Sequence, residues 1–229
     1  MNSTWNLPTP PGFSGLHLDK PITVYFRHLP HWRQEGATYF VTFRLHDSLP
    51  QERLHELRQL KLEWERQHPP PQSEAQLREF SQDMLDRIDG WLDQGAGTCR
   101  LKDVAAAKIV LDALHHFDND LYLLGSYVIM PNHVHVIVRP LQCDVKPLER
   151  ILQSWKRHAA WEINKLSDAI GTVWQEESFD QIIRDEEHLY FVIQYIGRNP
   201  RNAGLSAGDC RLWIRPAWHD AGWRFEPFP

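Results

Sequence analysis

The spacing of apolar residues predicts strands in four segments of the chain. Residues 37–46, ATYFVTFRLH, alternate strictly between two faces, and their β-branched and aromatic content favours a strand. Three further strands are predicted at 121–130, at 133–139 and near 181–184. Pro131 and Asn132 provide a turn, so the strands on either side of them form a hairpin.

Apolar residues recur at spacings of three and four in most of the remaining segments, which predicts helices there. The helices span about 50–68, 73–93, 104–117, 148–166 and 186–199. Ser73 and Gln76 form a capping box at the start of the second helix. Asp103 and Asp185 precede the third and fifth helices as N-caps, and Pro200 is expected to stop the fifth.

The order of these elements predicts an α+β fold. If 50–98 is an inserted helical hairpin, the rest reads βαββαβ followed by one more helix. That is the order of a ferredoxin-like antiparallel sheet with an added C-terminal helix. The predicted organisation is an irregular N-terminal arm (1–36), a main domain (37–205) and a Trp-rich C-terminal tail (206–229).

Composition and charge narrow the class of protein. The net charge is −5, so a protein that coats DNA by bulk charge is excluded, and any nucleic-acid binding must come from local patches. The inserted hairpin is acidic. Three widely spaced cysteines without a CxxC pair argue against a disulfide framework or a four-cysteine zinc site. No apolar run is long enough to span a membrane, and a cytoplasmic location is expected.

Two short motifs carry candidate chemistry. His133 and His135 are two residues apart in a predicted strand, so both imidazoles project from one face. This spacing fits a metal site, and a structural hairpin with two surface histidines is the more common case for such a pair. Tyr195 and Asn199 lie one turn apart on the last helix. The Asn199 side-chain oxygen could act as a ligand or as a helix cap beside Tyr195. The alternative is a tyrosine of the core and an asparagine at an ordinary helix end.

Taken together, the two motifs resemble a known family. MPNHVHVIV (130–138), WQEESFDQIIRDEEHL (174–189) and IIRDEEHLYFVIQYIGRNPRNAGL (182–205) are similar to the REP-associated tyrosine transposases of the HUH endonuclease superfamily. GATYFVTFRLHDS (36–48) is similar to the family's first strand. The resemblance covers about 36–48 and 103–205. It does not extend to the hairpin at 50–98 or to the tail.

This resemblance implies roles for the matching residues. His133 and His135 would be metal ligands, Asn199 the third protein ligand, and Tyr195 the nucleophile on a catalytic C-terminal helix. Mg²⁺ or Mn²⁺ suits a site of two imidazoles and an amide oxygen. The implied activity is metal-dependent cleavage and transfer of single-stranded DNA through a 5′-phosphotyrosine. The implied partner is single-stranded or hairpin DNA. The resemblance favours a monomer and leaves a homodimer open.

Several basic residues near the motifs are candidates for DNA contact: Arg139, Lys156, Arg157, Arg184, Arg198 and Arg201. Trp155 and Trp161 flank two of them on one predicted helix. The alternative is an ordinary solvated helix face. The tryptophans of the tail either pack on the domain or contact DNA.

Two other functions remain open at this point. The chain could be a domesticated protein that binds hairpin nucleic acid without turnover. It could also be a metal-dependent hydrolase in which water is the nucleophile, and a hydrolase of that kind would tolerate Tyr195→Phe.

Overall fold

Backbone hydrogen bonds join five strands into one antiparallel sheet in the computed structural model, which describes residues 6–26, 30–143, 146–206 and 208–226. The strands are β3 (Tyr39–Arg44), β4 (Tyr122–Ile129), β5 (His133–Pro140), β6 (Phe179–Ile182) and β7 (Arg211–Ile214). Their order across the sheet is β6-β3-β5-β4-β7. The first four of these strands in chain order therefore follow the ferredoxin-like arrangement, and the predicted fold class is confirmed.

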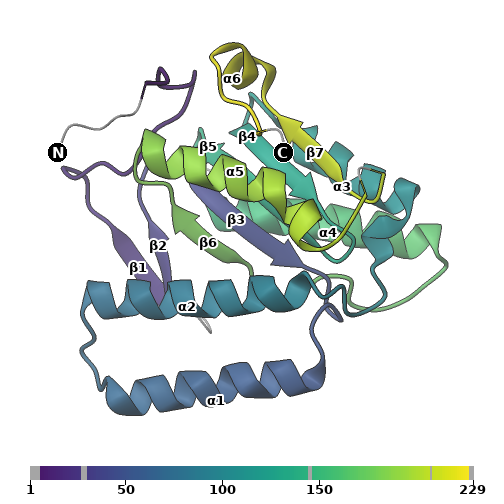
Figure 1. The fold of residues 1–229 in the computed structure, drawn as a ribbon, viewed down its shortest axis with the longest axis horizontal. Coiled ribbons are helices and arrows are strands. Elements are labelled where there is room, and N and C mark those ends of the chain that lie inside the picture. Colours follow the sequence, from purple (N-terminus) through teal and green to yellow (C-terminus); the bar gives the residue numbers. More distant parts are fainter. Residues whose placement is uncertain (1–5, 27–29, 144–145, 207, 227–229) are drawn as a thin grey trace.

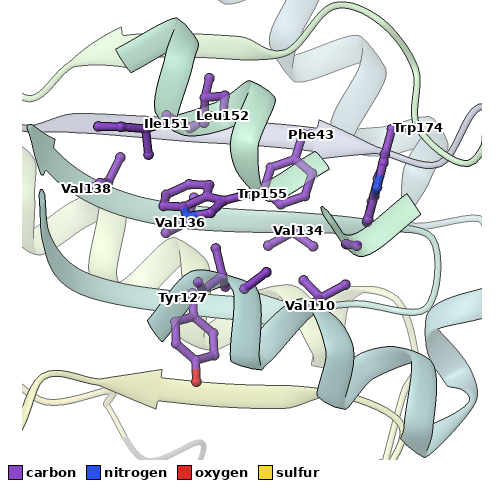
Figure 2. Packing of buried hydrophobic residues seen from close by; sticks show 14 of the residues in the cluster. Phe43, Val110, Tyr127, Val134, Val136, Val138, Ile151, Leu152, Trp155 and Trp174 are labelled. Carbon is purple, nitrogen blue, oxygen red and sulfur yellow. The ribbon is translucent and has the colours of Figure 1, made fainter. Parts of the chain in front are cut away.

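Two of the predicted helices cover one face of this sheet, α3 (Val104–His115) and α4 (Leu148–Leu166) (Figure 1). Strand alternation directs Phe43 of β3 and Val134 and Val136 of β5 towards them. Trp155 of α4 lies among these side chains (Figure 2). Burial of such large apolar groups is the main stabilising contribution to the fold, at about 25 cal/mol per Å² of apolar surface.

The opposite face is covered by α5 (Glu186–Asn202) (Figure 1). Asp185 caps it by accepting a hydrogen bond from a backbone N–H of the first turn, as predicted. The helix does not stop before Pro200, however, which lies inside it. A proline removes only one backbone donor. Because the Ala203 N–H still bonds the Asn199 carbonyl, the last turn persists beyond the proline.

The insertion is a helical hairpin, as predicted, made of α1 (Gln51–Gln67) and α2 (Glu74–Leu92). The Ser73–Gln76 capping box begins α2. The inner helix, α2, buries Phe80, Met84 and Ile88, whereas none of the described residues of α1 is buried. Figure 1 accordingly shows α2 against the domain and α1 outside it. A short 3-10 helix, η1 (Arg100–Lys102), leads from the hairpin to α3.

The N-terminal arm contains structure that the apolar pattern did not reveal. The segments β1 (Thr23–Phe26) and β2 (Pro30–Arg33) pair as a two-stranded antiparallel sheet. The prediction of an irregular arm is wrong for these segments, since strands of four residues are too short to show a clear period. Residues 1–5 and 27–29 of the arm lie outside the described part of the chain.

The C-terminal tail is built into the domain. Its strand β7 pairs with β4 at the edge of the sheet, and α6 (Pro216–Asp220) follows. Trp218 and Trp223 are buried, and their indole N–H groups donate to the carbonyls of Pro11 and Pro8, each at 2.9 Å. Of the two alternatives for the tail tryptophans, packing therefore holds for this pair. Their hydrogen bonds also tie the tail to the N-terminal arm.

Candidate active site

Strand β5 and helix α5 bring the four motif residues together. Because Val134 and Val136 face α3 and α4, His133 and His135 face α5. The two imidazole rings have centroids 4.6 Å apart, and the His135 ring is 5.2 Å from the ring of Tyr195. One turn further along α5, the Asn199 amide donates to the Tyr195 hydroxyl at 3.3 Å. Residues more than fifty positions apart in the chain thus form one cluster.

Asn132, in the turn before β5, orients the first imidazole. Its amide nitrogen donates to the Leu92 carbonyl at 3.0 Å, which directs its amide oxygen towards His133. That oxygen lies 2.7 Å from His133 Nδ1. A carbonyl oxygen can only accept a hydrogen bond, so Nδ1 carries the proton and Nε2 carries the lone pair. His133 Nε2 is therefore available as a ligand.

Thr42 orients the second imidazole. Thr42 of β3 is the cross-strand partner of His135, and its hydroxyl lies 2.8 Å from His135 Nδ1. The ring of Phe40 stacks on His135 with a centroid separation of 5.5 Å. A hydrogen bond at Nδ1 and a stacked neighbour together fix the ring, as is usual for histidines that hold metals through the other nitrogen.

Three buried polar atoms of the cluster have no hydrogen-bond partner among the described residues. They are His133 Nε2, His135 Nε2 and Asn199 Oδ1. Buried polar atoms are nearly always paired, because an unpaired one costs about 1–3 kcal/mol. Two imidazole nitrogens and an amide oxygen are a donor set that a divalent cation can use. The residues present therefore fit a metal ion.

The protonation of the two histidines agrees with this use. Burial lowers the pKa of His133 to about 3, against the opposing influence of the Asn199 side chain. Burial, and then the neighbouring His133, hold the pKa of His135 well below its usual 6.5. Both imidazoles are therefore neutral at pH 7, which is the form that binds a metal. In the described part of the chain, no group of three or more His, Cys, Asp or Glu side chains suited to a metal occurs.

A fifth residue, Asp89 of α2, enters the cluster from the inserted hairpin. The Tyr195 hydroxyl donates to Asp89 Oδ2 at 2.6 Å. Burial raises the pKa of Asp89 to about 7, with Asp93 and Asp86 adding to the rise and the hydrogen bond from Tyr195 opposing it. Burial and the Asp89 carboxylate together raise the pKa of Tyr195 above its usual 10.

Sequence reasoning missed Asp89, although a signal was present. The inner face of α2 repeats apolar residues at Leu85, Ile88 and Leu92, spaced three and four apart. Asp89 is the acid that interrupts this face, and its side chain is buried. A carboxylate on an apolar helix face requires a partner elsewhere in the fold, because an isolated buried charge is costly. The sequence could not name Tyr195 as that partner, since the two residues are over a hundred positions apart.

The basic residues singled out as DNA contacts do not form one patch. The Arg139 guanidinium donates to the Gly36 and Gly12 carbonyls, and the Lys156 ammonium donates to two carbonyls of the segment before β6. Lys156 and Arg157 lie on α4, behind the sheet from the cluster. The remaining three lie just before or on α5: Arg184, Arg198 and Arg201.

Trp155 cannot contribute to a DNA-binding face. It is buried, and its indole N–H donates to the Tyr122 hydroxyl at 2.8 Å. Trp161, on the same helix, is exposed. Neither alternative, DNA contact or a solvated helix face, holds for Trp155, whose ring belongs to the core in Figure 2.

Comparison with known proteins gives a distant structural similarity. No protein-family model and no curated protein matches the chain. A solved structure described as a REP-associated tyrosine transposase bound to a REP hairpin aligns over 80% of this chain and 74% of its own, with 16% sequence identity and a TM-score of 0.36. Within the described residues, no helix has the length and apolar character needed to cross a membrane. The case for a function rests on the residues of the site.

Proposed function

We propose that this protein is a metal-dependent endonuclease and strand-transferase that acts on single-stranded or hairpin DNA through Tyr195. The observation that carries the proposal is the set of three unpartnered atoms beside the tyrosine: His133 Nε2, His135 Nε2 and Asn199 Oδ1. A buried cluster of neutral ligand atoms next to a hydroxyl is the arrangement that phosphoryl transfer to a tyrosine needs.

His133, His135 and Asn199 would hold Mg²⁺ or Mn²⁺. When bound there, the cation would supply Lewis acidity and stabilise negative charge on a DNA phosphate. The chain's own contribution is orientation. Asn132 and Thr42 fix the two imidazoles, and the Asn199 amide holds the Tyr195 hydroxyl one turn away on the same helix.

Tyr195 would be the nucleophile. Its oxygen forms a bond to the phosphorus of the scissile phosphate while the bond from phosphorus to the 3′ oxygen breaks. The products are a 5′-phosphotyrosine and a free 3′-hydroxyl. Because the covalent link retains the phosphodiester energy, the strand can be rejoined to another 3′-hydroxyl, an option that hydrolysis by water does not leave. Positioning supplies much of the rate, since a phenol is a poor nucleophile at neutral pH.

The DNA substrate is proposed from the motif resemblance at 36–48 and 103–205 and from the charge on α5. Arg198 and Arg201 are exposed on the helix that carries Tyr195, although the chain as a whole is acidic. A single strand passing over α5 would meet both guanidinium groups, and a phosphate would take the place of Glu226, which pairs with Arg198 at 2.6 Å.

A covalent-adduct assay tests the proposal. The purified protein is incubated with Mn²⁺ or Mg²⁺ and an end-labelled panel of DNA hairpins with single-stranded flanks, and is then run on a denaturing gel that retains adducts. We expect a metal-dependent adduct that Tyr195→Phe abolishes. Tyr190→Phe is the matched control: Tyr190 is also on α5 but bonds Glu226 near the C-terminus, so it should keep the activity.

The denaturing gel and a parallel native gel separate the rival functions. Cleavage without an adduct that survives Tyr195→Phe would indicate a hydrolase that uses water. A hairpin that is shifted on the native gel but is neither cleaved nor linked to protein on the denaturing gel, under any metal condition, would indicate a domesticated binding protein. Either result contradicts the proposed function.

A further inference from the structure

The inserted hairpin lies outside the segments that resemble the transposases. It places the carboxylate of Asp89 against the Tyr195 hydroxyl. We propose that Asp89 is a catalytic base that accepts the proton of Tyr195 as its oxygen attacks the phosphate. This inference rests on the proposed function and deepens it, because it assigns the insertion a place in the reaction.

The contact geometry supports this role. Asp89 Oδ2 accepts the hydrogen bond of the Tyr195 hydroxyl at 2.6 Å, within the distance over which a proton passes directly. Its second oxygen, Oδ1, is also buried and has no partner among the described residues. The carboxylate therefore has capacity to accept a proton.

A buried aspartate at position 89 lowers the stability of the packing between α2 and the domain. It lies among Leu85, Ile88 and Leu92 on the face that packs against the domain, where an apolar residue would stabilise the hairpin more. A neutral Asn would accept the same hydrogen bond without the cost of burying a charge. A carboxylate at this position is thus better explained by proton transfer than by packing.

The chemistry of the site requires such a base. A phenol is protonated at neutral pH, so Tyr195 must lose its proton during attack. In the proposed step the O–P bond forms, the proton moves from Tyr195 to Asp89, the P–O3′ bond breaks, and the 3′ oxygen takes a proton from water. In the reverse step Asp89 returns the proton to Tyr195 as the tyrosine oxygen leaves phosphorus, and the attacking 3′-hydroxyl releases its proton to water.

The surroundings of Asp89 raise the pKa of its carboxyl group to a value near neutral pH. Burial is the main cause of its pKa of about 7, and Asp93 and Asp86 on α2 add to it. The ionisable group that faces it from α5 is Tyr195 itself. A base that titrates near the working pH combines a substantial ionised fraction with a strong affinity for the proton.

The test compares Asp89→Asn with wild-type protein under single-turnover conditions. Asn keeps the size and the hydrogen-bond acceptor but cannot take the proton. We expect adduct formation to slow on the order of 100-fold, and the rise of the wild-type rate with pH around 7 to disappear. Asp83→Asn is the matched control, because it removes a carboxylate from the same helix that is exposed and pairs with Arg87.

Calorimetric titration with Mn²⁺ provides a readout that is independent of turnover. If Asp89 acts as a base, Asp89→Asn binds Mn²⁺ as tightly as wild type, which also shows that the site is folded. Asp89→Glu, which restores a carboxylate, should recover part of the rate together with its pH dependence.

Three outcomes would overturn the assignment. Weakened Mn²⁺ binding in Asp89→Asn would make Asp89 a ligand, and an unchanged or faster rate would mean that it only holds Tyr195 in place. In both of these cases the wild type still forms the adduct, so the proposed function survives. If wild type and Asp83→Asn alike form no adduct, the proposed function itself fails, and the assignment fails with it.

Discussion

At the scale of single residues, the geometry of the candidate site depends on polar side chains outside the set of candidate ligands. Asn132 is an example, since a turn residue fixes the proton on His133 Nδ1 through an amide that is itself held by the Leu92 carbonyl. Leu92 is the last residue of α2, so this bond also links the inserted hairpin to the turn before β5, the strand that carries the two histidines. Partners of this kind commonly affect metal affinity although they do not touch the metal.

Replacing Asn132 with alanine should weaken Mn²⁺ binding. The change removes the acceptor that selects the His133 tautomer, and loss of such a partner typically costs about 10–100-fold in affinity. Calorimetric titration of the variant with Mn²⁺ measures the effect. Asn202→Ala is the control, because Asn202 is an exposed asparagine at the end of α5. Equal affinities in the two variants would contradict the role of Asn132.

At the scale of elements, α2 and β7 are additions to the ferredoxin-like core. Helix α2 packs beside the candidate site, and β7 pairs with β4 at one edge of the sheet. The hairpin contacts the candidate site through Asp89, and His133, His135 and Asn199 of that site are each exposed by 1% or less. At the other edge of the sheet, the tail packs Trp218 onto β4 at Gly125, where the register of β4 and β5 is shifted.

The contact between β4 and the tail predicts a large effect for a single methyl group. A Cβ at Gly125 would lie 2.2 Å from the Trp218 ring, far inside van der Waals contact. Gly125→Ala should therefore lower the free energy of unfolding by about 1–3 kcal/mol, the usual cost of overpacking. Denaturant unfolding followed by circular dichroism measures the change.

Gly90→Ala serves as the matched control for that substitution. Gly90 lies inside α2, and a Cβ there would meet nothing within 4 Å. Alanine is the better helix former, so this variant should gain up to about 1 kcal/mol. A Gly125→Ala protein as stable as wild type would show that Trp218 does not pack against β4 as described.

At the scale of the whole molecule, the sheet separates a face packed by α3 and α4 from the face that carries the candidate site. The helices α3 and α4 cover one face with a continuous apolar core (Figure 2), while α5 and the hairpin lie on the face that carries the histidines (Figure 1). The chain is acidic overall, with a net charge of −5. DNA affinity is therefore expected to be modest, strongly dependent on salt, and confined to the α5 side.

This asymmetry predicts different effects for basic residues on the two sides. Replacing Arg198 and Arg201 together with alanine should weaken hairpin DNA binding and lower the slope of log affinity against log salt by about one per lost phosphate contact. Arg157→Ala is the control, since Arg157 lies on α4 behind the sheet. Fluorescence anisotropy across a salt series measures both. An equal loss from Arg157→Ala would move the DNA-binding surface to the other face.

Much of the fold was predictable because its determinants are local. The capping box at Ser73 and the N-cap at Asp103 involve residues two or three positions apart, so the sequence alone locates these helix starts. The end of α5 was not predicted, since the turn containing Pro200 is held by a bond that the proline does not disturb. The strands β1, β2 and β7 have four residues each and gain their stability from pairing.

Periodicity and spacing act over a few residues, so they suffice to predict the order of the core elements and to place His133 with His135, and Tyr195 with Asn199, on common faces. Tertiary packing brings these two pairs together, lets Asn132 and Thr42 orient the imidazoles, and carries Asp89 from the insertion to Tyr195. Those contacts join segments distant in the chain. They form only when the sheet, α5 and the hairpin pack together, and no local pattern specifies that packing.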